Sequence, residues 1–552
     1  MPVLRFLPER LRARSGAASI EELRDALFRL KCETDMLEDG YLEVEINPDR
    51  PDMYSEEGIA RAVKGLLGLE YSWRPPRTAD SGITLRAGEV PSRPYIGAAV
   101  VRGVNIEDEE DLRQLIQFQE KLHDTIGRRR RKAAIGFHDL SKLPSGDVEY
   151  VELDIDEVSM VPLGGDTEVV AGRVLEETDQ GLKYGSIALR GRRHPFLLSG
   201  GKVIAMPPVI NSEITRIEPG TRDLFIDVTG TDLRTVKKIL DIIVSNLYER
   251  GATVYTVKVV APYGTITTPT LETGKIDLDA GWASRVLGYQ LSPAEAARLL
   301  ESMRHIVETV RGHTLTVTVP PFRADILGPI DLVEDIAIAV GYEKFYPIYD
   351  RPSRRGALLG ITRLARTVRT VLLGLGHVEV MQLNLTSPRL LDLLGVEGVR
   401  VENPVQQEYS VLRPSLAPSL LQVAAANQHA SKPVKVFEIG RIAAPSGGVI
   451  REDDRVGIMV MDSELSVEAV QAPLYALLRA LGVEFTIVPG GCPGFLLEGR
   501  CGTLMLGGER LGYFGEVHPR VLEELGIEYP VAVAEVSLRV MLEWRSRTRS
   551  RG

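Results

Sequence analysis

Cysteine is scarce in this chain. Its 552 residues include three cysteines, Cys32, Cys492 and Cys501. Their number is odd and their spacing is wide, so the pattern indicates neither a disulfide framework nor a zinc knuckle. So few cysteines are typical of a reducing, cytoplasmic compartment.

Long apolar runs are also absent. No segment approaches the roughly 20 apolar residues that a membrane-spanning helix needs. Residues 1–16 carry charges where a secretory signal would have a continuous apolar stretch, so no signal peptide is expected. The hydrophobic content of 44% and the charged content of 26% are typical of a globular protein. A chain of 552 residues should form several domains.

An excess of positive charge is absent as well. The net charge of -10 argues against a protein whose whole surface binds nucleic acid. Basic residues are nevertheless clustered in "GRRRRK", residues 127–132, and in the tail, residues 543–552. The cluster at 127–132 could contact a nucleic-acid backbone or could be an ordinary solvated loop, and its composition leaves both open.

Helical and strand periodicities divide the chain into four regions and predict a multidomain α+β protein. Residues 1–91 contain a short strand, a proline-rich turn and a helix capped by Ser55. Residues 92–262 mix strands and helices without strict alternation. Residues 268–347 suggest a compact domain of winged-helix type, and residues 353–552 an antiparallel sheet with flanking helices.

Four carboxylates lie close together in the third region. Asp331, Glu334 and Asp335 have the spacing that places side chains on one face of a helix, and Asp325 precedes them on a loop that could fold back. A hard divalent cation such as Mg²⁺ would relieve their repulsion. Acidic residues at a helix N-terminus also stabilise it by about 0.3–1 kcal/mol each without any metal. The spacing alone favours this simpler interpretation.

Polar residues gather at strand ends in the second region. The segments "PPVINSEIT" and "FIDVTGTD" contain Asn211, Ser212, Asp227, Thr229 and Thr231. These side chains could line a small binding or hydrolytic pocket, although such residues more often form turns. The eight histidines show no HxxxH pair, so no zinc site is indicated.

Four long segments, taken in order, resemble one family. They are "INPDRPDMYSEEGIARAVKGLLG", "VIAMPPVINSEIT" with "DLFIDVTGTD", "VPPFRADILGPIDLVEDIAIAVGY", and "VENPVQQEYSVLRPSLAPSLLQVAAANQ" with "KVFEIGRIA". The chain is similar to the β subunits of phenylalanyl-tRNA synthetases, in the shorter form found in archaea and eukaryotes. The resemblance extends over nearly the whole chain.

This resemblance implies a function for each region. Residues 1–91 would be an N-terminal α+β domain and residues 92–262 an editing domain that hydrolyses tRNA mischarged with tyrosine. By motif match, the pocket candidates are Asn211, Asp227 and Thr229, which would hold the tyrosine and orient a water.

The family also implies a metal and a non-catalytic domain. Residues 268–347 would carry a structural Mg²⁺ that joins the subunit to its partner, held by Asp325, Asp331, Glu334 and Asp335. Residues 353–552 would form a domain like the class II synthetase catalytic domain but without catalysis. They contain no glycine-rich segment that ends in an ATP-binding arginine.

The implied assembly is an (αβ)₂ heterotetramer. A separate α subunit would carry the active site for ATP-dependent charging of tRNA(Phe) with phenylalanine. One departure is Ala205, where relatives are expected often to carry serine. It leaves a non-editing structural or regulatory subunit as the alternative. A nucleic-acid-binding scaffold is a third possibility, disfavoured by the negative charge and the few basic residues in 292–303.

Overall fold

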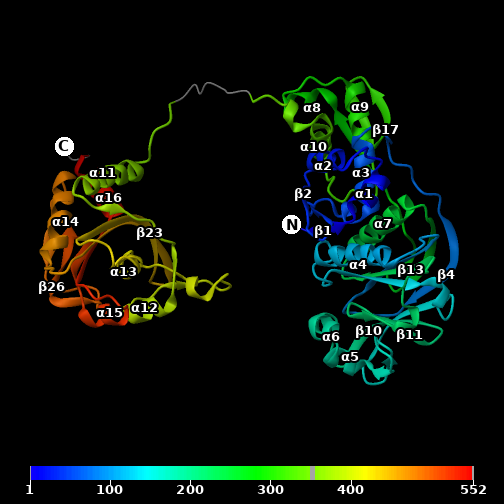
Figure 1. The fold of residues 1–552 in the computed structure, drawn as a ribbon, viewed down its shortest axis with the longest axis horizontal. Coiled ribbons are helices and arrows are strands. Elements are labelled where there is room, and N and C mark those ends of the chain that lie inside the picture. Colours follow the sequence, from blue (N-terminus) through cyan, green and yellow to red (C-terminus); the bar gives the residue numbers. More distant parts are fainter. Residues whose placement is uncertain (1, 348–354, 550–552) are drawn as a thin grey trace. The chain divides into compact units, whose positions relative to one another are not determined.

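The computed structural model describes residues 2–347 and 355–549, which fall into two compact units, residues 1–349 and 350–552 (Figure 1). The predicted start of the fourth region at 353 and the last three residues of the basic tail lie outside the described residues. Within the described part, no helix is long and apolar enough to span a membrane.

The first unit begins with a small sheet covered by helices. Strands β1, β3 and β2 pair antiparallel in that order. The Ser55 hydroxyl caps α3 by accepting from the Gly58 amide, as predicted. A Cβ on Gly58 would lie 1.8 Å from the Asp52 carbonyl oxygen, so only glycine allows α3 to pack this closely. The elements are β1 (Val3–Phe6), α1 (Pro8–Ser15), α2 (Ile20–Arg29), β2 (Glu33–Met36), β3 (Leu42–Glu45), η1 (Pro51–Met53) and α3 (Glu56–Leu66).

A ten-stranded mixed sheet forms the centre of the first unit. Its strands run in the order β12-β11-β10-β7-β4-β14-β5-β13-β6, with β15 paired to β14. They are β4 (Ala79–Ala87), β5 (Tyr95–Arg102), β6 (Ala133–Asp139), β7 (Asp147–Asp154), β10 (Arg193–Ser199), β11 (Lys202–Met206), β12 (Ile210–Asn211), β13 (Asp223–Gly230), β14 (Thr253–Ala261) and β15 (Gly264–Thr268).

Helices cover this sheet, and the core beneath them extends into the N-terminal module, the elements from β1 to α3. Apolar residues of α4 (Glu109–Asp124) and α7 (Leu233–Glu249) pack with β5, β6 and β13, and the same core includes Leu4 and Phe6. The two regions predicted to meet near residue 91 therefore share one hydrophobic core. A smaller lobe contains β8 (Ser159–Met160), β9 (Val169–Val170), α5 (Ala171–Glu177) and α6 (Asp179–Tyr184). Three 3-10 turns, η2 (Leu140–Lys142), η3 (Gly185–Ile187) and η4 (Glu213–Thr215), complete this part.

The last part of the first unit combines three helices with a three-stranded sheet of order β16-β18-β17. Ser292 caps α9 by accepting from the Glu295 amide at 3.2 Å. The elements are β16 (Gly274–Asp279), α8 (Ala280–Leu287), α9 (Pro293–Ser302), β17 (Ile306–Arg311), β18 (Thr314–Val319), α10 (Pro329–Val340) and η5 (Tyr342–Lys344).

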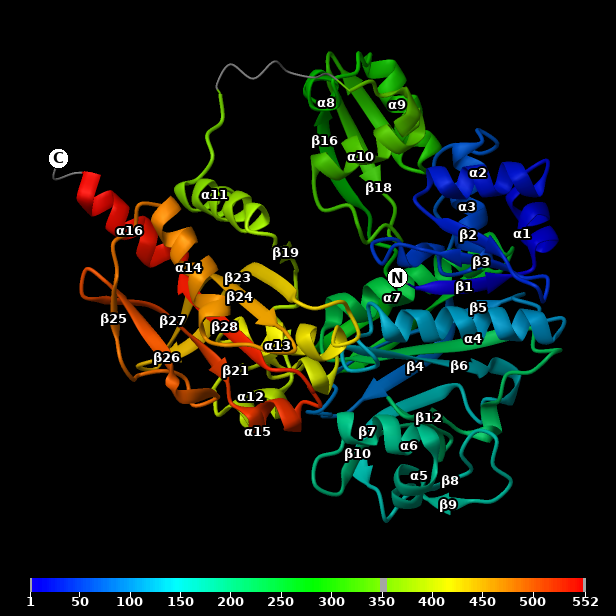
Figure 2. The same cartoon turned by 60° about the vertical axis from the view of Figure 1, so that its left-hand side comes forward.

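The second unit is built on a seven-stranded sheet of order β19-β23-β24-β28-β27-β26-β25 (Figure 2). It is antiparallel, as predicted, except that β19 runs parallel to β23. The strands are β19 (Val378–Glu379), β23 (Val434–Ser446), β24 (Val449–Met461), β25 (Thr486–Val488), β26 (Leu496–Leu506), β27 (Glu509–Val517) and β28 (Val531–Ser537).

Two separate apolar cores flank this sheet. One contains α11 (Gly360–Gly374), α14 (Glu468–Ala480) and α16 (Leu538–Arg549), and the other contains α12 (Pro388–Leu394), α13 (Ala417–Ala426) and α15 (Pro519–Glu524). A small sheet joins β20 (Leu385–Thr386), β22 (Val411–Leu412) and β21 (Val399–Arg400), with η6 (Gln407–Tyr409) beside it. The predicted multidomain α+β class is confirmed.

One expectation about cysteine needs correction. Cys492 and Cys501 form a disulfide in the second unit, whereas Cys32 is free and buried. The odd total and the wide average spacing hid a pair only nine residues apart. The chain turns back between β25 and β26 and brings the two sulfurs together.

Candidate functional site

A cavity of about 560 Å³ opens in the central part of the first unit. Its walls come from α4, β6, α6, β12, β13 and the loops beside them, and its volume is typical of a small-molecule site. The polar lining residues are Gln119, Glu120, Arg130, Asp179, Gln180, Lys183, Tyr184, Asn211, Thr215, Arg216 and Asp227.

A chain of three buried polar side chains forms one wall of this cavity. The His138 Nε2 atom lies 2.9 Å from Asp227 Oδ1, and its Nδ1 atom lies 2.8 Å from Thr215 Oγ1. Asp227 and Thr215 line the cavity, whereas His138 lies behind them and is fully buried. The sequence indicated Asp227, but nothing in it linked His138 or Thr215 to the same site.

Gly136 makes room for this arrangement. It pairs with Asp227 across β6 and β13. A Cβ at Gly136 would lie 2.1 Å from Asp227 Oδ1 and 2.9 Å from His138 Nε2. Any larger residue would therefore displace the carboxylate.

The other two predicted pocket residues lie in different surroundings. Asn211 lines the cavity and its Nδ2 donates to the Phe137 carbonyl at 3.1 Å. Thr229 is buried and is not among the lining residues. Its Oγ1 and carbonyl oxygen accept from the Arg93 guanidinium at 3.2 and 2.7 Å. Thr229 thus binds Arg93 and does not face the cavity.

Arg93 connects Thr229 to the basic loop. Its NH1 donates to the Arg130 carbonyl at 2.9 Å, and burial lowers the pKa of Arg93 to about 10. Residues Arg128, Arg129 and Arg130 all have left-handed backbone conformations. The loop at 127–132, for which the sequence left open a nucleic-acid contact or a solvated loop, is therefore a tight turn. The buried Arg93 side chain holds it through the Arg130 carbonyl.

Arg130 is the one residue of this basic loop that lines the cavity. Its guanidinium donates to the Val209 carbonyl at 2.9 Å and to Glu120 at 2.7 Å, and it stacks over the Tyr184 ring. Burial acts to raise the pKa of Glu120, but His123 and Arg130 outweigh it and lower that pKa to about 2. Glu120 is thus a carboxylate that holds Arg130 in place.

Ala205 lies away from the cavity. It packs in an apolar cluster with Leu197 and Phe225, and it is not among the lining residues. A serine hydroxyl at this position would lie in that apolar cluster. The alanine therefore does not reduce the polarity of the cavity wall.

The four acidic residues of the third region do not converge. Arg323 holds Asp325 through contacts of 2.9 and 2.6 Å. Arg323 also contacts Asp335 at 2.8 Å. The Asp335 carboxylate lies 2.6 Å from His305 Nε2 as well. Burial would raise the pKa of Asp335, but Arg323 and His305 hold it well below its usual value.

The remaining two carboxylates have other partners. Asp331 accepts from the Leu327 and Gly328 amides at 2.7 and 2.8 Å and so caps α10, as the simpler interpretation expected. Glu334 is exposed and pairs with Lys31 at 2.9 Å. Within residues 2–347 and 355–549, no three His, Cys, Asp or Glu side chains are placed to hold a metal ion.

The present arrangement therefore does not fit a Mg²⁺ ion shared by all four carboxylates, because three of them are paired with protein cations and Asp331 accepts from backbone amides. Asp335 is also buried together with apolar residues of α10, so its carboxylate is not exposed to a partner. The magnesium site remains a prediction from the resemblance.

Two buried carboxylates of the second unit have partners within that unit. Glu535 accepts from Tyr513 at 2.9 Å and from the Leu416 amide at 2.9 Å, and it pairs with Arg455. Arg413 and Glu438, which lie in the two stretches of the fourth segment that carries the resemblance, form a buried ion pair of 2.6 Å. These groups hold the sheet together.

Comparison with known proteins defines the class first. Residues 276–342 match a tRNA synthetase B5 domain, and residues 349–538 match the phenylalanyl tRNA synthetase beta chain CLM domain. The fold and these matches make the chain a component of an aminoacyl-tRNA synthetase. The phenylalanine–tRNA ligase beta subunit of Aeropyrum pernix is 54% identical over 99% of this chain and 100% of its own length. This chain belongs to the family of phenylalanine–tRNA ligase beta subunits, as the sequence motifs predicted.

More distant relatives agree. The beta subunit of Sulfurisphaera tokodaii is 39% identical over 94% of this chain and 95% of its own length. A crystal structure of an N-terminal fragment of the Pyrococcus horikoshii phenylalanyl-tRNA synthetase beta subunit is 34% identical, with a TM-score of 0.59. It covers 61% of this chain and 99% of that fragment. The fold of the first unit is thus shared with this relative.

Proposed function

We propose that the first unit hydrolyses tRNA(Phe) mischarged with tyrosine, at the cavity lined by Asn211 and Asp227. The observation that carries this proposal is a cavity of about 560 Å³ whose buried wall presents Asp227 and Thr215. A tyrosyl group differs from a phenylalanyl group by one hydroxyl. A site with hydrogen-bond acceptors can discriminate on this group, because the analogue that lacks it leaves them unpaired.

The surroundings of the cavity suit the end of a tRNA. Arg128, Arg129 and Arg131 are exposed on the loop that carries the cavity-lining Arg130. Exposed arginines next to a pocket can contact phosphates while the aminoacyl group enters. This combines the two interpretations of the loop: one arginine belongs to the pocket and three face solvent.

A deacylation assay tests the proposal. Asp227→Asn should slow release of tyrosine from Tyr-tRNA(Phe) by about tenfold or more, because it removes the charge from the cavity wall. The matched control is Asp139→Asn, a buried aspartate on the same sheet that accepts from Thr221 at 2.8 Å and does not line the cavity. Equal rates for both variants and the unchanged protein would assign Asp227 a structural role only.

We further propose that an α subunit supplies the charging reaction. The second unit uses Arg413 and Glu438 in a buried ion pair with each other, which suits a domain that supports assembly. ATP would bind to the α subunit, and the complex would be an (αβ)₂ heterotetramer. The purified chain should not charge tRNA(Phe) with phenylalanine by itself, and adding the α subunit should restore charging. Charging by the single chain would contradict this division of labour.

A further inference from the structure

Three side chains form a hydrogen-bond relay in the wall of the cavity. Thr215, His138 and Asp227 come from η4, β6 and β13, and at most 2% of each residue is exposed. Only His138 has contacts of 3 Å or less to both of the others, at 2.8 and 2.9 Å. Thr215 and Asp227 line the cavity in front of it.

The proton positions in this relay follow from the chemistry of its ends. An ionised carboxylate only accepts hydrogen bonds, so His138 Nε2 must carry the proton that Asp227 accepts. In the neutral ring, Nδ1 is then a lone-pair acceptor, and the Thr215 hydroxyl must donate to it. With a neutral imidazole, the Thr215 proton therefore points toward His138, and the Thr215 oxygen can only accept from a molecule in the cavity.

We infer that His138 is a positioning residue that makes this wall an acceptor-only surface for a hydrogen-bond donor of the bound aminoacyl group. The inference rests on the editing function proposed above. An aminoacyl ester offers two kinds of donor: its α-ammonium group and, for tyrosine, its phenolic hydroxyl. Without the imidazole, the Thr215 hydroxyl could turn its proton toward the cavity and the Asp227 carboxylate would lose a partner.

The neighbours of His138 restrict it to this position. The Phe225 ring lies 6.0 Å from the imidazole between ring centroids. On the other side, Gly136 leaves room for the contact between His138 and Asp227, since a Cβ there would approach both. The relay is thus held by backbone and apolar packing as well as by its own hydrogen bonds.

Two substitutions separate positioning from packing. The full chain is assembled with its α subunit, and release of tyrosine from Tyr-tRNA(Phe) is measured. His138→Phe keeps a ring of similar size and should lower kcat/KM roughly 10- to 100-fold, mainly through KM, because a hydrogen-bonded charge loses its partner. His138→Gln keeps an amide donor and acceptor and should recover part of this loss. Charging with phenylalanine should not change.

A buried histidine of the same sheet provides the control. His194 is fully buried, and its Nδ1 faces the Pro195 carbonyl at 3.1 Å. His194→Phe should deacylate at the rate of the unchanged protein. Equal losses in His194→Phe and His138→Phe, or wild-type rates in His138→Phe, would overturn the positioning role.

The donor is identified by comparing two substrates. If the phenolic hydroxyl meets the wall, His138→Phe should lower deacylation of Tyr-tRNA(Phe) and leave the slow deacylation of Phe-tRNA(Phe) unchanged. If the α-ammonium group meets it, both rates should fall by the same factor. Each result supports the relay and names its ligand group.

A measurement without activity separates this inference from the editing proposal. The ring ¹⁵N signals of the eight histidines can be resolved by single substitutions. His138 should show the neutral ring with its proton on Nε2, and Asp227→Asn should shift its signal. A proton on Nδ1 would overturn the relay. Absence of deacylation by the unchanged complex would overturn the editing proposal, and the tautomer would still decide the relay.

Discussion

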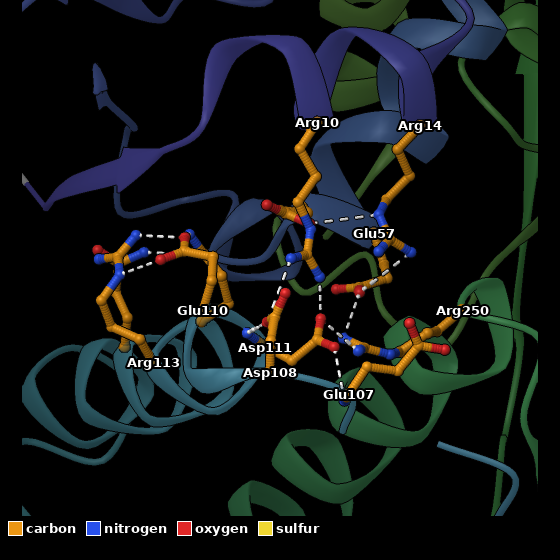
Figure 3. A network of polar contacts seen from close by, with 12 residues as sticks. Arg10, Arg14, Glu57, Glu107, Asp108, Glu110, Asp111, Arg113 and Arg250 are labelled. Carbon is orange, nitrogen blue, oxygen red and sulfur yellow. Dashed lines mark hydrogen bonds and ion pairs between the residues drawn. The ribbon is translucent and has the colours of Figure 1, made fainter. Parts of the chain in front are cut away.

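Asp111 should be the most sensitive point of an ion-pair network that joins the N-terminal module to the central sheet (Figure 3). Its carboxylate contacts Arg10 of α1 and, at 2.5 Å, Arg250 at the C-terminal end of α7, and it accepts from the Glu107 amide at 2.9 Å. Its side chain is 3% exposed, whereas those of Arg10 and Arg250 are 24% and 12% exposed. One residue thus links three helices.

Asp111→Ala removes the carboxylate and leaves both arginines. Breaking a buried pair costs about 3–5 kcal/mol when the partner charge is left buried without compensation. Here Arg10 keeps Glu56 and Arg250 keeps Glu57, and both guanidinium groups retain some contact with water, so the expected loss is smaller, about 2–3 kcal/mol. Urea unfolding of the variant should show this loss in the transition of the first unit and no change in that of the second.

The control is Asp108→Asn. Asp108 also approaches Arg10, at 3.5 Å, but its side chain is 59% exposed. Asp108 caps α4, and asparagine is as good a helix cap as aspartate. Exposed pairs contribute about 0–1 kcal/mol, so the stability of the Asp108→Asn variant should change by less than about 1 kcal/mol. A loss below about 1 kcal/mol for Asp111→Ala would show that the network contributes no more than surface pairs do.

Four further predictions follow from the described residues. Gly136→Ala should abolish tyrosine release while phenylalanine charging persists, because the new methyl group would meet Asp227; normal release would contradict the cavity assignment. Burial raises the pKa of Asp241 from 3.8 to about 6, so its folded form binds a proton more readily, and its contribution to stability should fall as pH rises through 6. Asp241→Asn should remove this pH dependence in unfolding curves recorded between pH 4 and 8, and an unchanged slope would refute it. Reducing the Cys492–Cys501 disulfide should lower the free energy of unfolding of the second unit by roughly 2–3 kcal/mol. In the Cys492→Ser variant, reductant should leave the unfolding transition of the second unit unchanged. Magnesium should leave the melting temperature of the isolated chain unchanged, because its acidic cluster is already paired with protein cations and amides; a rise would support the metal site that the resemblance predicts.

The sequence by itself determined the local elements, the fold class and the family. Helix starts were readable at Ser55 and Ser292 because a cap depends only on neighbouring residues. The α10 start was readable for the same reason, and Asp331 caps it. Four long motifs in order identified the family, since each extends over a continuous stretch of chain.

Only the tertiary structure decided which polar residues share a site. Asp227 and Thr229 lie on the same side of β13, yet one faces the cavity and the other is covered by Arg93. Strand alternation sets the side of the sheet but not what packs over it.

The same limit applies to partners far apart in the sequence. The register of β6 against β13 brings His138 to Asp227, 89 residues away, and the path of the chain brings Lys31 to Glu334, 303 residues away. Such contacts depend on how sheets and helices pack, and no local pattern encodes them. Whether a carboxylate acts as a cap or as half of an ion pair therefore depends on what the fold places beside it.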